Sequence, residues 1–447
     1  MSFVQTKVAS AIESDSHGYI YYPPPVTTIE ETGLSLLWLQ DLALKILYFQ
    51  GYLTGFKIAD LMALPFSGIV DQILEALKRE KFVEVKSSTM GLGEGSYQYA
   101  ITGAGTARAR EALDRSQYAG PAPVPIDVYN ESIRQQSRKR NAITRKTLQQ
   151  ALSHLVLSEK IMLSLGPAIN SGTSIFLYGA PGNGKTSIAR AIGDLVLTES
   201  LFIPYAVYVD GQIVKIYDTV NHQEAPFEDP ARSNNGTLRL GMKRDPRWLR
   251  IHRPFIVTGG ELTLEGLDLV FDDVKKYYEA PFQVKANGGI LLIDDFGRQL
   301  VRPRDLLNRW IVPLENRIDY LTLHTGRKVE VPFDVLVVFS TNLPPKDLVD
   351  EAFLRRLRHK IEIADPSFEE YRLIFQRVAA TKGVSFNEQG LAYLLQAWYI
   401  KKGRKIRASH PRDLCDQIID IANFLGIRPA MTRELIDHAA ESYFVEL

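Results

Sequence analysis

The chain of 447 residues contains a single cysteine, Cys415, which excludes an internal disulfide framework and is typical of a reducing compartment. Long apolar runs are also missing. The most apolar long stretch, residues 34–49, is interrupted by side chains such as Asp41 and Lys45, so it is too polar to span a bilayer. Residues 1–16 contain no apolar segment of the kind that secretory signals carry. From these absences we expect a cytoplasmic protein with no membrane span.

An excess of charge of either sign is absent too. The 53 lysines and arginines nearly balance the 52 aspartates and glutamates, which leaves a net charge of +1. No global attraction to nucleic acid or to an anionic membrane follows from such a composition. Internal repeats and low-complexity tracts are likewise missing, and the share of hydrophobic residues, 45%, is ordinary for a globular protein. A chain of this length is expected to form about three domains.

One glycine-rich segment carries the strongest functional signal. It follows an apolar, strand-like run at residues 175–178 and precedes a segment whose apolar residues recur at helical spacing. The segment consists of Gly179, Ala180, Pro181, Gly182, Asn183, Gly184, Lys185 and Thr186, followed by Ser187. In such a loop, backbone N–H groups and the positive end of the helix dipole surround phosphate oxygens. Lys185 can reach the β- and γ-phosphates and the Thr186 hydroxyl can bind Mg²⁺, so the sequence predicts a nucleoside triphosphate site.

Two further strand-like runs end in polar residues that suit this chemistry. Residues 290–293 lead into Asp294 and Asp295, and residues 335–339 lead into a Ser-Thr-Asn sequence that ends at Asn342. We expect Asp294 to hold Mg²⁺ and Asp295 to polarise the attacking water, because a buried parallel strand delivers carboxylates at its carboxyl end. Asn342 would lie between the γ-phosphate and that water. Taken alone, an asparagine here is also consistent with a turn or a helix cap.

In this order the motifs resemble the AAA+ ATPase family over residues of about 140–447. The resemblance implies ATP and Mg²⁺ as cofactors, a parallel-sheet α/β core and a C-terminal helical lid. In that family the asparagine after the fourth core strand is sensor 1, which matches Asn342. An arginine finger, matched by Arg356 or its neighbour Arg355, completes the site of the next subunit in a ring, here expected to be a hexamer. The sensor 2 arginine at the start of a lid helix is matched by Arg412.

Residues 320–331 predict a hairpin just before the sensor 1 strand. It resembles the pre-sensor-1 hairpin of the AAA+ branch that includes MoxR-like ATPases, magnesium chelatases and RuvB, where the hairpin faces the pore of the ring. The tip would offer His324, Arg327 and Lys328 to that pore. The MoxR-like group is the nearest of these relatives.

The chain departs from the family pattern in two places. The usual acid pair is Asp-Glu, whereas the second acid here is Asp295, with a shorter side chain. A catalytic group misplaced by about 1 Å can cost on the order of 10²-fold in rate. A long insertion at about 203–260 also contains no identifiable aromatic-glycine pore loop. Threading of a polypeptide through a ring is therefore less well supported than nucleotide binding.

The pattern along the chain predicts five parts. They are an extended N-terminal segment (1–32), a winged-helix-like domain (33–117), a linker and basic helical segment (118–149), an AAA+ α/β nucleotide-binding domain (150–365) and a helical lid (366–447). The second part resembles a winged helix because three helices precede two strand-like runs. Acidic residues outnumber basic ones over residues 1–117, which favours a protein-docking or ring-assembly role over DNA binding. The basic segment from Arg134 to Lys146 could touch nucleic acid, although a solvated helix face fits it as well.

These motifs together predict a ring-forming ATPase that remodels a protein partner, as the MoxR-like resemblance implies. The substrate or adaptor is not identified by the sequence, and nucleic acid is the less favoured partner. Two alternatives stay open. One is a DNA-associated motor or loader with the winged helix on nucleic acid, and the other is a weakly hydrolysing nucleotide switch, motivated by Asp295.

Overall fold

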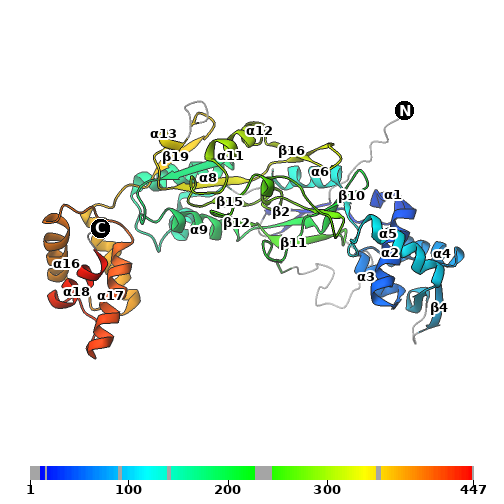
Figure 1. Ribbon diagram of the computed structural model, residues 1–447, viewed down its shortest axis with the longest axis horizontal. Helices are drawn as coiled ribbons and strands as arrows, with labels where there is room; N and C mark the ends of the chain where they lie inside the picture. The colour runs from blue at the N-terminus through cyan, green and yellow to red at the C-terminus, as the bar shows by residue number, and fades with distance from the viewer. Residues whose placement is uncertain are drawn as a thin grey trace.

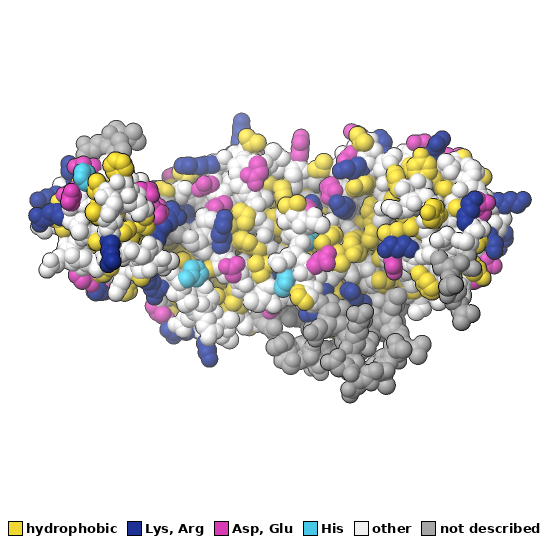
Figure 2. Space-filling view, turned by 90° about the horizontal axis from the view of Figure 1, so that it is seen from below, with side chains coloured by type: hydrophobic (Ala, Val, Ile, Leu, Met, Phe, Trp, Pro, Cys, Tyr) yellow, Lys and Arg dark blue, Asp and Glu magenta, His cyan; other side chains and the backbone are white. Residues whose placement is uncertain are grey.

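The computed structural model describes residues 11–15, 18–88, 93–137, 142–226, 244–348 and 354–444. The molecule is elongated, with a helical N-terminal part at one end, a β-rich centre and a helical C-terminal part at the other end (Figure 1). Basic and acidic side chains are interspersed over the face drawn in Figure 2, in line with the balanced composition. Of the helices described, none is both long enough and apolar enough to cross a bilayer. The predicted basic residues at 138–140 lie outside the described residues.

A five-stranded, all-parallel sheet forms the centre of the α/β part. In spatial order its strands are β12 (Phe255–Thr258), β15 (Ile290–Ile293), β18 (Leu336–Thr341), β7 (Ser174–Tyr178) and β19 (His359–Glu362). Successive side chains of a strand point to opposite faces, so both faces of these apolar runs need a cover. Ile175 and Leu177 pack in one hydrophobic cluster, whereas Phe176 packs in another.

Helices pack against both faces of the central sheet. One layer consists of α7 (Arg145–Ala151), α8 (Glu159–Ser171) and α9 (Lys185–Val196), and the other contains α11 (Pro303–Arg309) and α12 (Ile311–Asn316). On the second side, Trp310 is fully buried against Phe333 and Phe339. The α/β fold class predicted from the sequence is therefore confirmed.

A second sheet, to which the insertion contributes β9 and β10, lies between this core and the N-terminal part (Figure 1). Its strands are, in order, β13 (Val270–Asp272), β14 (Tyr277–Glu279), β10 (Gln212–Lys215), β9 (Ala206–Val209) and β6 (Val124–Pro125). Beside it, β8 (Ser200–Pro204) and β11 (Trp248–His252) form an antiparallel ribbon. The described residues of the predicted insertion, about 203–260, thus contribute strands to the second sheet and the ribbon, and β12 within that range belongs to the central sheet.

The segment predicted as a linker belongs to this second sheet. Val124 is fully buried and pairs with Val207 in β6, and α6 (Ile126–Ser137) buries Tyr129 and Ile133. Residues 118–149 were predicted as a linker and basic helical segment. Within them Val124–Pro125 form the edge strand β6, a position that tolerates proline as well as a linker does.

The predicted hairpin is present as β16 (Ile318–Thr322) and β17 (Lys328–Pro332). Its apolar side chains, including Leu321 and Val329, are buried in the same cluster as the insertion sheet. At the tip, the backbone N–H of His324 donates to the Tyr278 hydroxyl at 2.9 Å, and Arg327 pairs with Asp210 at 2.5 Å. The tip itself is exposed at His324, Arg327 and Lys328, and Asp210 of the insertion contacts it from one side. That the tip faces a pore stays a prediction.

The N-terminal part is organised around four helices and a small sheet. They are α2 (Leu36–Gln50), α3 (Gly55–Met62), α4 (Asp71–Arg79), α5 (Gly103–Arg115), and strands β3 (Tyr52–Thr54), β4 (Val83–Ser88) and β5 (Tyr97–Ile101). The Thr102 side chain caps α5 by accepting from the Gly105 N–H, as expected for a helix starting there. The third strand, β3, was not predicted. Gly68, at φ 87°, has a left-handed backbone that a helix cannot contain, and α4 starts after it at Asp71.

Within the predicted extended segment, residues 11–15 and 18–32 are described and contain two strands and a short helix. Strands β1 (Ala11–Asp15) and β2 (Gly18–Tyr22) pair in antiparallel fashion, and α1 (Ile29–Thr32) follows with a capping box between Thr28 and Glu31. The sequence reading missed α1 because one helical turn is too short to show a periodic pattern.

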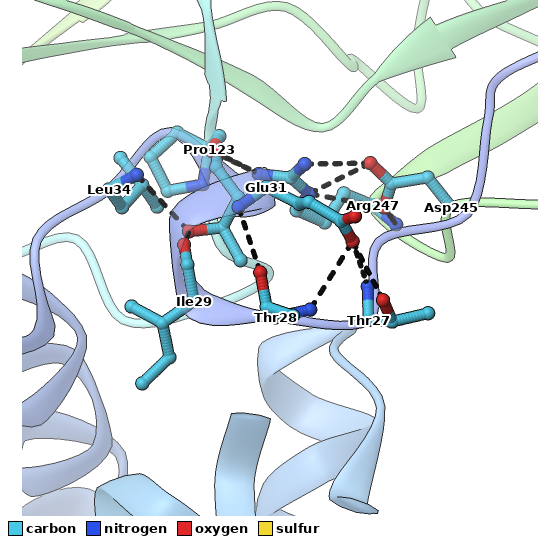
Figure 3. Close-up of polar contacts among 9 residues, drawn as sticks. Thr27, Thr28, Ile29, Glu31, Leu34, Pro123, Asp245 and Arg247 are labelled. Carbon is cyan, nitrogen blue, oxygen red and sulfur yellow. Dashed lines mark hydrogen bonds and ion pairs between the residues drawn. The ribbon is translucent and has the colours of Figure 1, made fainter. Parts of the chain in front are cut away.

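A buried ion pair fixes the N-terminal part to the insertion (Figure 3). Arg247 and Asp245 pair at 2.7 Å with side chains only 2% and 3% exposed. Arg247 also donates to the backbone oxygens of Thr32 and Pro123, at 2.8 and 3.2 Å. The ring of Trp38 packs edge-on against Tyr208 close by in the second sheet. Arg247 therefore joins three chain segments: its own, before β11, the N-terminal part at Thr32, and the segment that enters β6 at Pro123.

The C-terminal part is helical, as predicted. It contains α15 (Phe368–Lys382), α16 (Glu388–Leu394) continued by a π-helical turn (Leu395–Ile400), α17 (His410–Leu425) and α18 (Arg433–Tyr443). These elements share one core, in which Cys415 is fully buried.

We expect acid to weaken this helical part through His410. Its Nδ1 lies 2.8 Å from the Tyr399 hydroxyl among the rings of Tyr443 and Phe444, and burial lowers its pKa to about 4. The unfolded chain takes up the proton near pH 6.5, so the stability contributed by neutral His410 is lost as pH falls from about 6.5 to about 4. Thermal unfolding at pH 7 and pH 5 should show a loss of about 2 kcal/mol. A His410→Asn variant that loses as much as the wild type would contradict this assignment.

Candidate functional site

The glycine-rich segment forms a tight loop between β7 and α9. Gly179, Gly182 and Gly184 have φ values of 145°, 79° and 86°, a region that other residues rarely adopt. A Cβ at Gly179 would lie 2.2 Å from the Ile363 carbonyl oxygen, which no side chain could tolerate. The glycines therefore let the loop close against β19 and direct its backbone toward the start of α9, where N–H groups lack helical partners.

Lys185 lies at the centre of this loop. Its Nζ donates to the carbonyl oxygens of Gly179 and Ala180 at 3.0 and 2.9 Å, and to Asn342 Oδ1 at 2.7 Å. Burial lowers the pKa of Lys185, while the nearby Asp295 and Asp294 act in the opposite direction. The ammonium is thus held inside the loop, in reach of any phosphate that the loop surrounds.

Thr186 and Asp294 meet beside it. The Thr186 hydroxyl donates to both carboxylate oxygens of Asp294, at 3.1 and 3.0 Å. Hydroxyl and carboxylate oxygens are the hard ligands that Mg²⁺ prefers, usually together with phosphate oxygens and water. Across the described ranges no cluster of three or more His, Cys, Asp or Glu side chains could hold a metal by itself. These two residues therefore fit Mg²⁺ that arrives with a nucleotide.

Asp295 and Asn342 continue the same network. Asn342 Nδ2 donates to Asp295 Oδ1 at 3.0 Å, so a chain of polar contacts runs from Lys185 through Asn342 to Asp295. Asp295 has φ 49°, a left-handed conformation that aspartate tolerates better than most residues. Gln299, which the sequence reading missed, donates to the Asp294 carbonyl oxygen at 2.8 Å and so supports this turn. No local motif marks Gln299 as part of the site.

The two arginine-finger candidates come just before β19, at the end of the parallel strands opposite to the glycine-rich loop. Arg355 is exposed, and Arg356 pairs with Glu315 at 2.6 Å. Both line a basic depression of about 640 Å³ together with Thr173, Leu314, Glu315, Arg317 and Arg358. A cavity of about 680 Å³ is lined by residues such as Asn170 and Leu336 and by none of the predicted site residues. The structure therefore does not bring the finger candidates to the phosphate loop of their own chain.

Arg412 is also away from the loop. Its side chain is 65% exposed and pairs with the adjacent Asp413 at 2.9 Å. The lid segment that does touch the loop is residues 407–409, since a Cβ on Gly182 would lie 2.5 Å from Ser409 Oγ and 3.8 Å from Arg407 Cβ. Arg407 was not predicted, because the family pattern placed the lid arginine at the start of α17.

The comparison with family models matches only the C-terminal helical part of the chain. Residues 367–442 match a family model described as "Domain of unknown function (DUF8689)", which is confined to the lid. No curated protein matches the chain.

Three solved structures are similar at low identity. NtrX from Brucella abortus is 15% identical with a TM-score of 0.39, over 66% of this chain and 57% of that one. The RuvB Holliday junction branch migration motor of Thermotoga maritima is 15% identical with a TM-score of 0.36, over 68% and 71%. The FIGL-1 AAA domain is 16% identical with a TM-score of 0.34, over 68% and 82%. Likenesses this weak carry no argument of their own, and the chain spans little more than half of NtrX; the fold rests on the parallel sheet and its phosphate loop.

Proposed function

We propose that this protein is a nucleotide-driven AAA+ ATPase that couples ATP hydrolysis to the remodelling of a protein partner. One observation carries the proposal: five side chains from three strand ends converge on the glycine-rich loop. They are Lys185, Thr186, Asp294, Asp295 and Asn342. A cation, a metal-binding pair, a carboxylate and an amide are the groups that phosphoryl transfer to water needs.

Each group has a distinct part in the proposed reaction. Lys185 neutralises charge on the β- and γ-phosphates, while Thr186 and Asp294 hold Mg²⁺. Bound Mg²⁺ supplies charge neutralisation on the phosphate oxygens. Asp295 accepts a proton from the attacking water, and the Asn342 amide, already bonded to Asp295, orients that water. Because Asn342 fixes the position of Asp295, the shorter acid is compatible with turnover.

The arginine finger is proposed to act between subunits. His359, at the start of β19, pairs in register with Ile175, whereas the phosphate loop begins after Tyr178. Residues 355 and 356 precede β19, so they lie about 15 Å or more from their own loop at roughly 3.3 Å per strand residue. An arginine at this edge can reach a nucleotide only on a neighbouring copy, as a ring such as a hexamer would allow.

The N-terminal part is proposed to bind the protein partner. The hairpin β16–β17 packs in one cluster with the second sheet, and Arg247, just before β11, hydrogen-bonds to the N-terminal part at Thr32. Movement at the nucleotide site can therefore pass through packed elements to the partner, without a threading loop. The outward side chains of α4, including Asp71, Glu75 and Lys78, are of mixed charge, which favours a protein partner over DNA.

Asp295→Asn is expected to bind ATP but to hydrolyse it about 10²–10⁴-fold more slowly, because the amide cannot take the proton. The measurements are phosphate release at saturating ATP and binding of ATP by calorimetry. Asp305→Asn, an exposed acid on α11, serves as the matched control and should keep wild-type turnover.

Equal turnover in wild type and Asp295→Asn would contradict the proposed reaction. Wild-type protein that binds ATP without multiple turnover would favour the nucleotide switch. Stimulation of turnover by duplex or single-stranded DNA, lost steeply with added salt, would favour the DNA-associated motor.

A further inference from the structure

The cavity of about 680 Å³ lies at the amino ends of the central strands, opposite to the glycine-rich loop that follows β7. Ile290 and Leu336, the first residues of β15 and β18, line it and are almost fully buried. Its walls come from the end of α6, from α8, from the end of α9 and from the ribbon of β8 and β11. Ligand pockets have volumes of about 300–1,000 Å³ and lie preferentially where parts of a protein meet. The cavity therefore has the size and the position of a ligand site outside the nucleotide site.

The inner wall of this cavity is apolar. Besides Ile290 and Leu336, it contains the buried side chains of Ile169 on α8 and Leu201 on β8. Exposed lining residues, such as Thr198 after α9, form the rim. Apolar surface gains free energy when it leaves water, so this inner wall favours a ligand with an apolar body.

Two arginines give the cavity its charge. Arg253 is only 5% exposed, and its side chain pairs with Glu199 at 2.8 Å and donates to the Gly288 carbonyl oxygen at 2.6 Å. The Nε of Arg250 donates to Ser200 Oγ at 2.8 Å. Among the described residues that line the cavity, Glu199 is the one carboxylate beside these two guanidinium groups. The described lining therefore carries one positive charge in excess, on side chains that the protein holds in place.

We propose that this cavity binds a small organic acid, whose carboxylate contacts Arg250 and Arg253 and whose apolar chain packs against the buried starts of β15 and β18. A guanidinium presents N–H groups in a planar fork that matches the two oxygens of a carboxylate. One carboxylate balances the excess charge of the described lining, whereas a phosphate monoester carries about −1.5 to −2 near pH 7. The proposal goes beyond the proposed function, because none of the predicted site residues lines the cavity.

Straight-chain carboxylates of increasing length test the apolar half of this ligand. Each CH₂ group that becomes buried should strengthen binding about threefold to fourfold, so octanoate should bind about a hundredfold or more tightly than butyrate. Octanol has the same chain without the charge and should bind about tenfold or more weakly than octanoate. The measurement is titration calorimetry of the full chain without nucleotide.

A pair of variants tests whether octanoate binds in the cavity. Arg250→Gln removes one guanidinium and should weaken octanoate binding about tenfold or more. Arg190→Gln, at an exposed arginine on α9 that does not line the cavity, is the matched control and should bind octanoate as the wild type does. Melting curves without ligand confirm that both variants are folded.

The single native cysteine allows a second test of the position, independent of the arginines. Cys415 is fully buried, so a thiol reagent added to the folded protein reacts with a cysteine introduced at an exposed position. Octanoate should slow the modification of Thr198→Cys at the rim of the cavity. It should leave the rate unchanged for Lys160→Cys, at an exposed position of α8 outside the cavity.

Four results would overturn the proposal. The first is no binding of octanoate, and the second is binding of octanol as tight as that of octanoate. The third is tighter binding of octyl phosphate than of octanoate, which would replace the carboxylate by a phosphate. The last is an equal effect in a variant and its control, either on octanoate binding or on protection of the introduced thiol, because the ligand would then bind elsewhere. None of these measurements depends on ATP, so the proposed function stands or falls separately.

Discussion

Replacement of Lys185 by alanine is expected to weaken ATP binding by about a hundredfold or more. The ammonium is buried in the loop and bonded to two loop carbonyl oxygens and to Asn342, so its position is fixed before a nucleotide arrives. A hydrogen bond to a charged group contributes about 1.5–3 kcal/mol, and Lys185 can reach two phosphates. Two such contacts correspond to roughly 10²–10⁴ in affinity.

Calorimetry with ATP and Mg²⁺ measures this effect directly. Alanine is a strong helix former, so α9 should still start at residue 185 in the variant. Lys160→Ala, an exposed lysine on α8, is the control for loss of one positive charge and should bind ATP normally. ATP binding by Lys185→Ala within threefold of the wild type would mean that the loop is not the nucleotide site.

Much of the fold could be predicted because its signals are local. Each strand of the central sheet is a short apolar run, and the phosphate loop joins one of them to a helix with an apolar face. The linker at 118–125 was misjudged because its role depends on β9, more than eighty residues further along the chain. Pairing between distant strands leaves no mark in the composition of either partner.

The candidate site likewise contains some residues that could be predicted from the sequence and others that could not. Thr186, Asp294 and Asn342 could be chosen from the sequence because parallel strands deliver their carboxyl ends to one edge of the sheet. Arg407 and Asp365 could not be chosen from the sequence, because their place beside the glycine-rich loop depends on how the lid packs on Gly182 and Asn183. Arg412 was chosen by family pattern, and its side chain points to Asp413 instead.

Contacts to the hairpin change how the insertion is understood. The sequence left the insertion without a role, whereas its Asp210 pairs with Arg327 of the hairpin and its strands β9 and β10 share a sheet with β14, whose Tyr278 contacts His324. Arg247 of the insertion makes buried contacts to Thr32 in the N-terminal part and to Pro123 beside β6. A continuous packed path therefore links the strand that ends in Asn342 with the N-terminal part, through β17, the insertion and α6.

Arg356→Ala is expected to retain ATP binding and to lose about 10³–10⁵ in turnover, because the finger stabilises charge that develops only in the transition state. Its ion pair with Glu315 is partly exposed, at 31% and 46%, so its loss should cost at most about 1 kcal/mol of stability. Arg304→Ala, an exposed arginine on α11, controls for lost charge. Arg355→Ala is measured in parallel, and a loss confined to that variant would move the finger to Arg355.

Mixing variants tests whether the finger acts between subunits. Arg356→Ala subunits keep an intact phosphate loop, and Lys185→Ala subunits keep an intact finger, so a mixed ring contains some complete sites at the boundaries between them. Phosphate release by the mixture should exceed that of either variant alone and should depend on their ratio. Arg356 lies at the amino end of the parallel strands, too far from the loop of its own chain to reach it. A mixture no more active than its components, under conditions where the subunits exchange, would contradict the shared site and leave hydrolysis to groups within one chain.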